Sequence, residues 1–243
     1  YAEMKITVLC ENTSDNAALS AEHGLSLYIE TDMHILLFDM GQTALFADNA
    51  RALGKDLGRV DTAVLSHGHY DHAGGIKAFF EANSHAPLYL NENAFDNYYN
   101  GAEKYIGMDK SLADNSRLHL TDDELRIDKQ LSLYSCNERT RTYKTNPYGL
   151  CERKNGGFVP DSFLHEQYLL IEENGKRVLL SGCSHKGVLN ILDWFKPDVF
   201  VGGFHFTKLD ANGEGAEVLN QAAEEMLSYP TVYYTCHCTG VEQ

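Results

Sequence analysis

Three imidazoles and one carboxylate lie within six residues, in the stretch His67-Gly68-His69-Tyr70-Asp71-His72. Alternate side chains of an extended chain point to the same side, so His67 and His69 can bind one ion. If a helix follows, Asp71 and His72 can face a second ion beside the first. Imidazole and carboxylate ligands without a dominant thiolate set favour a catalytic site over a structural one. We therefore predict two divalent metal ions, with zinc preferred and iron or manganese as alternatives.

Hydrophobic periodicity predicts the elements that must position this loop. Strand-like and helix-like runs alternate along the chain, which suits two β-sheets flanked by helices. The expected strands are 6–10, 25–30, 35–38, 62–66, 87–90, 168–172, 177–181, 198–201 and 231–235, and the expected helices are 44–54, 73–83, 187–195 and 213–229. The stretch 91–128 is polar and rich in tyrosine, and it is expected to be irregular helix and cover. The loop 137–161 has no clear period and is expected to be a functional lid.

The composition limits the domain count and the partners. A chain of 243 residues with 43% hydrophobic residues and no evident linker predicts one domain, 1–243. The formal charge of -15 disfavours nucleic acid and anionic membranes as partners, which leaves a small-molecule substrate. No export signal or long apolar run is evident, and six cysteines are too few for a disulfide framework, so we expect a cytoplasmic protein. The sequence does not indicate an oligomeric state.

The H-x-H-x-D-H pattern and the runs around it resemble the metallo-β-lactamase superfamily. That family has such a loop between a strand and a helix, and the resemblance covers most of the chain in the expected order. It implies an α/β (α+β) fold, an αββα sandwich of two mixed β-sheets flanked by helices. More narrowly, four motifs resemble proteins similar to dihydropterin ribofuranosyl-aminobenzene phosphate synthase. These motifs are Glu22-His23-Gly24-Leu25-Ser26, the run from Ser181 to Gly187, Gly202-Gly203-Phe204-His205 and Cys236-His237-Cys238-Thr239-Gly240.

Several further residues end strand-like runs and could complete the metal site. His185 could join His67 and His69 at the first ion, but His165 competes for the same role, and the sequence does not decide between them. His237 resembles the last histidine ligand of the family. Cys183 stands where many relatives have an aspartate that bridges the two metals; it could bind metal or be a buried core thiol.

Four other positions have weaker interpretations. Asp39 is expected to accept a hydrogen bond from a ligand histidine and so fix the orientation of its ring. His205 is a candidate for substrate binding or for general acid catalysis. His23 could line the cleft but fits better as a surface residue paired with Glu22, and His34 is expected to face solvent.

A metal-activated water makes hydrolysis the expected reaction, because a zinc-type ion lowers the pKa of bound water to about 7. Asp71 would hold this water in line, and His205 would act on the leaving group. Basic residues of the loop 137–161, among them Arg139 and Arg141, suggest an anionic substrate such as a phosphate ester. The alternatives are a pterin-related condensing enzyme, as the resemblance implies, and a metal-binding protein without hydrolase activity. Diiron redox chemistry fits poorly, since such relatives usually carry a glutamate at the position of His69 and a fused flavin domain.

Overall fold

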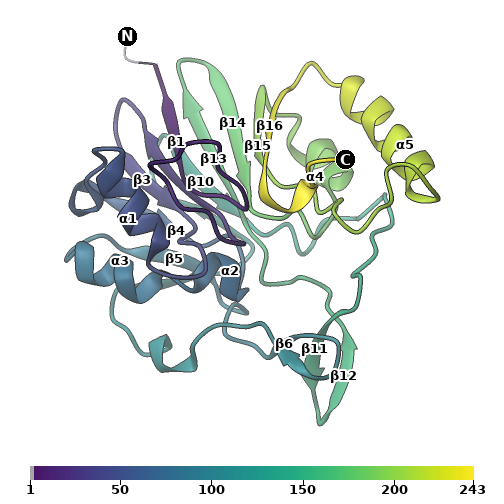
Figure 1. The fold of residues 1–243 in the computed structure, drawn as a ribbon, viewed down its shortest axis with the longest axis horizontal. Helices are drawn as coiled ribbons and strands as arrows, with labels where there is room; N and C mark the ends of the chain where they lie inside the picture. Colours follow the sequence, from purple (N-terminus) through teal and green to yellow (C-terminus); the bar gives the residue numbers. More distant parts are fainter. Residues whose placement is uncertain (1–2) are drawn as a thin grey trace.

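The computed structural model describes residues 3–243, and two six-stranded sheets lie face to face at its centre with helices on both outer faces (Figure 1). The first sheet has the order β1 (Lys5–Cys10), β2 (Ser26–Glu30), β3 (Ile35–Phe38), β4 (Thr62–Val64), β5 (Leu88–Asn91) and β8 (Leu118–Thr121). The second has the order β16 (Val232–Thr235), β15 (Val199–Gly202), β14 (Lys176–Ser181), β13 (Tyr168–Glu173), β10 (Leu131–Tyr134) and β9 (Glu124–Arg126). Both sheets mix parallel and antiparallel pairs, as the sequence predicted.

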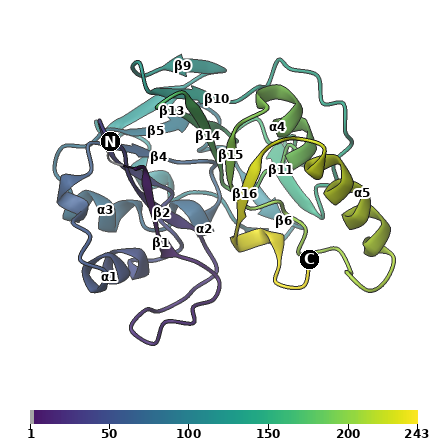
Figure 2. The ribbon, with the colours of Figure 1, turned by 90° about the horizontal axis from the view of Figure 1, so that it is seen from above.

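Helices close the two outer faces. The first sheet is covered by α1 (Leu45–Ala52) and α3 (Ile76–Ala82), and the second by α4 (Val188–Phe195) and α5 (Gly215–Leu227); Figure 2 shows the two halves side by side. The short helix α2 (Tyr70–Ala73) carries the end of the metal loop. Single 3-10 turns lie at η1 (Leu57–Arg59), η2 (Lys110–Leu112) and η3 (His237–Thr239). None of the helices in the described part is long and apolar enough to span a bilayer.

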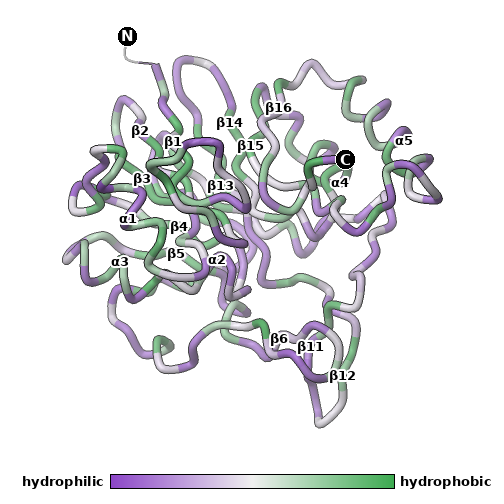
Figure 3. The backbone as a smooth tube through the Cα atoms, in the orientation of Figure 1, coloured by the Kyte–Doolittle hydropathy of each residue, from purple (hydrophilic) through white to green (hydrophobic). Residues whose placement is uncertain are grey.

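Alternating side chains of the strands form three apolar layers. In β3, Leu36 and Phe38 point into the layer between the sheets, whereas Leu37 packs under the helices of the first sheet. In β14, Leu180 joins the middle layer and Leu179 packs toward α4. Because both faces of these central strands are buried, they are largely hydrophobic in Figure 3. The rigid double sheet places the strand ends that carry the site.

Parallel pairing brings the ends of distant strands to one edge. In the first sheet Phe38 pairs with Val64, so Asp39 and the loop from His67 leave the sheet together. In the second sheet Ser181 pairs with Gly202, and Gly202 pairs with Thr235. Chains that emerge from the carboxyl ends of parallel strands form the usual crevice of α/β proteins. All the candidate residues after these strands therefore belong to one edge.

The expectation that the stretches 91–128 and 137–161 lack regular strands was wrong. A third, four-stranded sheet has the order β12 (Gly157–Pro160), β11 (Leu150–Lys154), β6 (Tyr98–Asn100) and β7 (Lys104–Tyr105), so parts of both stretches expected to be irregular are strands. The helix expected over 73–83 is present as α3, which begins three residues later, and the short helix α2 precedes it. Gly74 and Gly75 separate the two helices, and their backbone packs so tightly that added Cβ atoms would lie 2.0 and 2.1 Å from main-chain oxygens.

Candidate metal centre

The first cluster consists of His67, His69 and His185. Their ring centroids are 4.6 to 5.1 Å apart, and all three residues are buried. The three Nε2 atoms are buried and have no hydrogen-bond partner among the described residues. Leaving a polar atom buried without a partner costs about 1–3 kcal/mol, so three together need an explanation. A cation bound by the three lone pairs provides one.

The second cluster joins Asp71, His72 and His237. The Nε2 atoms of the two histidines are 3.2 Å apart, and Asp71 Oδ2 lies 3.2 Å from His237 Nε2 and 3.5 Å from His72 Nε2. Ligands about 2.0–2.1 Å from a tetrahedral zinc ion would be about 3.3 Å from one another. The spacing therefore fits a single small divalent cation. Asp71, His72 and His237 thus fit a metal ion of the kind that the H-x-H-x-D-H pattern predicts.

Asp39 determines which nitrogen of His72 is free. Its Oδ2 lies 2.6 Å from His72 Nδ1 and also accepts a hydrogen bond from the Ser66 hydroxyl at 2.6 Å, while Oδ1 accepts from the Ser66 amide. A carboxylate cannot donate, so Nδ1 of His72 carries a proton, and in the neutral ring Nε2 is the atom that keeps its lone pair. The hydrogen bond expected at Asp39 is thus present, and its donor is His72.

Asp39 also orients a histidine of the first cluster, His67, through the hydroxyl of Ser66. Its hydroxyl oxygen is 2.8 Å from His67 Nδ1, and because that hydroxyl donates to Asp39, it accepts the Nδ1 proton of His67. The unpartnered Nε2 of His67 is therefore the lone-pair atom. Gly182, directly after β14 of the second sheet, packs against Ser66. A side chain there would collide with the hydroxyl, since a Cβ would lie 2.2 Å from Ser66 Oγ.

His237 has its own orienting partner. Its Nδ1 is 2.8 Å from Asn12 Oδ1, an oxygen that also accepts from the Gly24 amide. Nδ1 therefore carries the proton, and Nε2 faces His72 and Asp71. His72 and His237 would then direct two lone pairs at each other across 3.2 Å, an arrangement that a proton or a metal ion between them stabilises.

His165 uses both ring nitrogens within the protein. Its Nδ1 accepts from the Gly68 amide at 2.9 Å, which leaves the proton on Nε2, and that nitrogen is 3.1 Å from Asp161 Oδ2. No lone pair of the neutral ring remains for an ion. The geometry thus favours His185 over His165 as the third histidine of the first cluster. His165 instead lies behind the loop, stacked on Tyr98 with centroids 3.8 Å apart.

Cys183 lies between the two clusters. Its Sγ is 3.2 Å from His72 Nε2, and it falls within 4.8 Å of ligand atoms of both His185 and His237. Burial and the neighbouring thiol of Cys238 raise its pKa, so the thiolate needs a nearby cation to form. Cys236 and Cys238 flank His237 without joining either cluster in the described part, and they pack in the core.

The electrostatic environment differs between the clusters. Burial and the neighbouring imidazoles hold the pKa values of His67 and His185 well below the usual range, which keeps both rings neutral. Burial opposes charge at His72 as well, but the carboxylates of Asp71 and Asp39 outweigh it and raise the pKa of that ring. The carboxyl of Asp71 has a pKa well below its usual range, because the adjacent His72 charge and hydrogen bonds outweigh burial. Positive charge is therefore stabilised at the second cluster.

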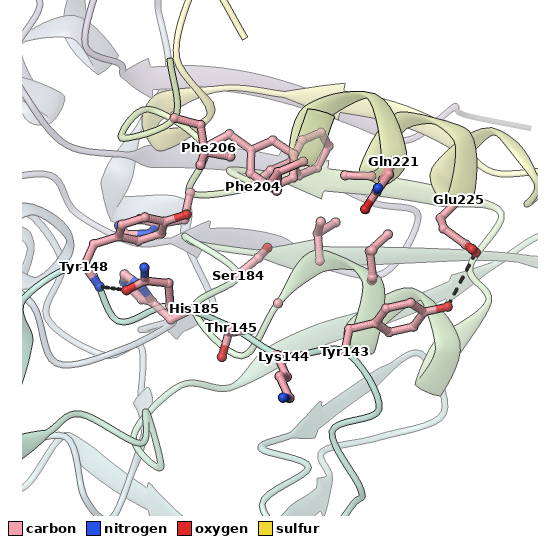
Figure 4. A pocket seen from close by; sticks show the side chains of 18 of the residues that line it. Tyr143, Lys144, Thr145, Tyr148, Ser184, His185, Phe204, Phe206, Gln221 and Glu225 are labelled. Atoms are coloured by element: carbon pink, nitrogen blue, oxygen red, sulfur yellow. Dashed lines mark hydrogen bonds between the residues drawn. The ribbon is translucent and has the colours of Figure 1, made fainter. Parts of the chain in front are cut away.

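His205 lies at the boundary between the metal centre and a cavity. Its ring centroid is 4.4 Å from that of His185, and both residues line a cavity of about 550 Å³. Burial and neighbouring imidazoles lower the pKa of His205 to about 4, so it is a neutral ring at neutral pH. Figure 4 shows this cavity with Tyr148 and His185 at one end and Glu225 at the other.

Sequence reasoning missed several residues of the site. Asn12 and Ser66 orient ligand rings, and Asp161 pairs with His165, yet none carries a motif of its own. His23 was expected at the surface, and although its side chain is 54% exposed, its Nε2 lies 3.1 Å from Asp71 Oδ2. The Glu22-His23-Gly24 motif was the signal that could have placed it.

The basic residues of the loop 137–161 do not converge on the cavity. Arg139 stacks over Phe195 and donates to the Trp194 carbonyl, and Arg141 donates to the Ser162 carbonyl. Neither lines the cavity beside the metal centre, whereas Lys144 does. The expectation that these two arginines face the substrate was therefore wrong.

Comparisons with known proteins identify the family and support the fold. The family model of the metallo-beta-lactamase superfamily matches residues 20–225. A crystal structure described as a metal-dependent hydrolase of the beta-lactamase superfamily superposes with a TM-score of 0.79 at 32% identity, covering 98% of this chain and 90% of that one. A 7,8-dihydropterin-6-methyl-4-(beta-D-ribofuranosyl)-aminobenzene-5'-phosphate synthase of Methanocaldococcus jannaschii is 28% identical over 98% of this chain and 88% of its own. An uncharacterized protein of the same organism is 29% identical over 97% of this chain and 90% of its own. The chain belongs to the metallo-beta-lactamase superfamily.

Proposed function

We propose that this protein is a hydrolase with two divalent metal ions, preferably zinc, that cleaves a small anionic substrate such as a phosphate ester. The observation that carries the proposal is the convergence of three buried, unpartnered Nε2 atoms beside a second cluster with the spacing of metal ligands. The similarity to a metal-dependent hydrolase at 32% identity supports the reaction type.

The proposed ligands follow from the free lone pairs. His67, His69 and His185 hold the first ion, and Asp71, His72 and His237 hold the second. Cys183, which approaches both clusters, is proposed to contact the ions from between them. Ions bound there would act as Lewis acids and lower the pKa of a bound water to about 7.

The protein's own groups have separate tasks in this proposal. Asp39 and Ser66 keep the ring protons of His72 and His67 on Nδ1, which leaves the ligand atoms free. Asp71 is proposed to orient the attacking water through its carboxylate. His205, at the mouth of the cavity, binds the substrate beside the reacting centre; as a neutral ring it is better suited to hydrogen bonding than to general acid catalysis.

Metal-dependent turnover tests this proposal. The purified protein is stripped with chelator, reloaded with zinc, iron or manganese, and assayed on phosphomonoesters, phosphodiesters, lactones and thioesters. We expect one ester class to be hydrolysed only by the reloaded protein. His185→Ala should abolish turnover and remove one metal equivalent, whereas His165→Gln should keep both metals. Absence of turnover on every class, with two metals bound, would reject the hydrolase assignment.

A second candidate is a pterin-related condensing enzyme. The observation in its favour is the similarity to the Methanocaldococcus jannaschii synthase over nearly the whole chain. In that case the same centre would bind the phosphorylated group of a substrate and promote condensation. The test incubates the reloaded protein with a dihydropterin whose 6-methyl carbon carries a diphosphate leaving group and with a ribofuranosyl-aminobenzene phosphate. Mass spectrometry then distinguishes a condensed product, formed with release of diphosphate, from simple hydrolysis.

A further inference from the structure

The cavity beside the metal centre has two ends of different character, and we call it the α5 pocket. It is enclosed by the loop 143–148, the start of α4, the residues 204–206 after β15, and one face of α5. Its volume of about 550 Å³ lies within the range of about 300–1,000 Å³ that is usual for small-molecule sites. The buried His185, whose Nε2 has no partner among the described residues, connects it to the first metal cluster.

The middle of the α5 pocket is apolar. Phe204, Val188 and Ala222 are buried and line it, together with Phe206 from the same strand end. Apolar and aromatic walls of this kind bind a flat or hydrocarbon group by excluding water. The part of a ligand next to its reacting group is therefore expected to be apolar.

The far end of the α5 pocket is acidic. Glu225 of α5 lies there, and Tyr143 on the opposite wall donates a hydrogen bond of 3.4 Å to its Oε2, as Figure 4 shows. Glu224 also lines the pocket, and Lys144 is the one lysine or arginine among its lining residues in the described part of the chain. A second anionic group would be repelled here, whereas an amine would gain hydrogen bonds and charge attraction.

The wall that carries Tyr143 is fixed to the scaffold. The Tyr143 amide donates to Asn190 Oδ1 at 2.8 Å, and Asn190 Nδ2 donates to the Tyr143 carbonyl at 2.8 Å. Asn190 itself is buried in α4. The Tyr143 wall is thus fixed to α4, and the Tyr143 hydroxyl bonds to Glu225, an exposed residue of α5. A ligand that reaches from His185 to Glu225 is therefore selected by length as well as charge.

From this arrangement we propose that the α5 pocket binds the organic part of an anionic substrate that has an apolar, preferably aromatic, body and ends in an amine. The anionic group lies at the metal centre and the amine at Glu225. The inference rests on the proposed function only for the position of the reacting group, and it narrows the substrate class from any small anion to an amine-terminated one.

Binding of non-hydrolysable probes tests the proposal without requiring turnover. The probes are benzylphosphonates with a para side chain of one to four carbons that ends in an amine, a methyl group or a carboxylate. Their dissociation constants are measured by titration calorimetry on the metal-loaded protein. At the best length we expect the amine to bind about tenfold more tightly than the carboxylate, as expected when an attraction replaces a repulsion at a charged site.

Two substitutions, one on α5 and one beside it, test whether Glu225 causes the preference for the amine probes. Glu225→Gln should reduce the preference for the amine to less than about threefold. Glu214→Gln removes the same charge from an exposed position that does not line the pocket, and it should leave the preference unchanged. A common loss in both variants would indicate a general charge effect and overturn the assignment of Glu225.

The outcomes separate this inference from the hydrolase proposal. Equal binding of amine and carboxylate, tighter binding of the carboxylate, or no binding of any probe would overturn the α5 pocket assignment, even if the protein hydrolyses simple esters. Amine selectivity that depends on Glu225 would support the assignment even if every ester assay is negative, in which case only the hydrolase proposal fails.

Discussion

Replacing Asp39 with asparagine should weaken the binding of both metal ions. Asp39 accepts three hydrogen bonds, two from Ser66 and one from His72 Nδ1. If the amide oxygen of the introduced asparagine takes the place of Oδ1, its NH2 group faces Nδ1 of His72. That ring must then move its proton to Nε2, the atom that faces Asp71 and His237. In this tautomer Nε2 of His72 carries the proton and can no longer bind a metal ion.

The size of the effect follows from the unsatisfied groups. To bind metal, His72 must carry its proton on Nδ1 again. The NH2 group of the introduced asparagine and the Nδ1 proton of His72 would then point at each other, at a cost of about 1–3 kcal/mol. Since about 1.4 kcal/mol corresponds to a tenfold change, zinc affinity at the second cluster should fall roughly 10- to 100-fold. Affinity at the first cluster should fall as well, because the same NH2 group faces the Ser66 hydroxyl. That hydroxyl can then no longer donate to position 39 and donates to His67 Nδ1 instead, which moves the ring proton of His67 to Nε2.

Competition with a fluorescent zinc chelator measures the two affinities as separate steps. Asp61→Asn is the matched control, since Asp61 also pairs with a histidine, His34 Nδ1 at 2.9 Å, but away from the metal centre. The control should keep both affinities. Wild-type affinity at either step in Asp39→Asn would refute the argument that Asp39 sets the tautomers of His72 and, through Ser66, of His67.

Two further predictions concern stability and the metal loop. Burial alone would lower the pKa of His34, but hydrogen bonds to Asp61 and Asp128 raise it. The charged ring therefore stabilises the folded protein fully below the unfolded pKa of about 6.5, and this stabilisation is lost as pH rises through the folded pKa. His34→Gln should therefore destabilise the protein by about 1 kcal/mol in urea unfolding at pH 6 and by less at pH 9; an equal loss at both would contradict the role of charge. Gly68→Ala would place a Cβ 2.0 Å from the Ala94 carbonyl oxygen, so it should cost about 1–3 kcal/mol and release metal, whereas Gly157→Ala, with its nearest atom at 3.9 Å, should do neither.

The sequence predicted the scaffold well where periodicity is strong. The central strands and the helices α1, α4 and α5 appear within a few residues of the expected bounds, because alternating or helical burial is visible locally. The hairpin of β11 and β12 was missed since its strands carry few buried residues and pair with β6, some 50 residues earlier. Such pairing leaves little periodic signal in the sequence.

The metal site was predictable in residue type but not in detail. The H-x-H-x-D-H spacing indicated two ions, yet the choice between His165 and His185 depends on which ring nitrogen is already bonded. For His165 that is decided by Gly68, 97 positions away in the chain. The left-handed backbone of Asp39, His205 and His237, with φ of 60°, 57° and 53°, is also set by tertiary packing and has no local signature in these residue types.

The expectation that His34 faces solvent shows the same limit. A turn between two strands suggested exposure, but His34 bridges Asp61 and Asp128 and its side chain is 15% exposed. Both carboxylates come from other segments of the chain. Long-range polar partners were therefore the main part of the structure that the sequence did not reveal.

The most direct test of the two-metal centre is the metal content per chain by elemental analysis, on protein purified without chelator and reloaded with zinc. We expect about two equivalents in the wild type and about one in each of His67→Ala and His237→Ala, because each variant removes a ligand of one cluster. His119→Ala, at an exposed histidine of β8, should retain both. Absence of bound metal in the wild type, or full retention in both ligand variants, would contradict the account.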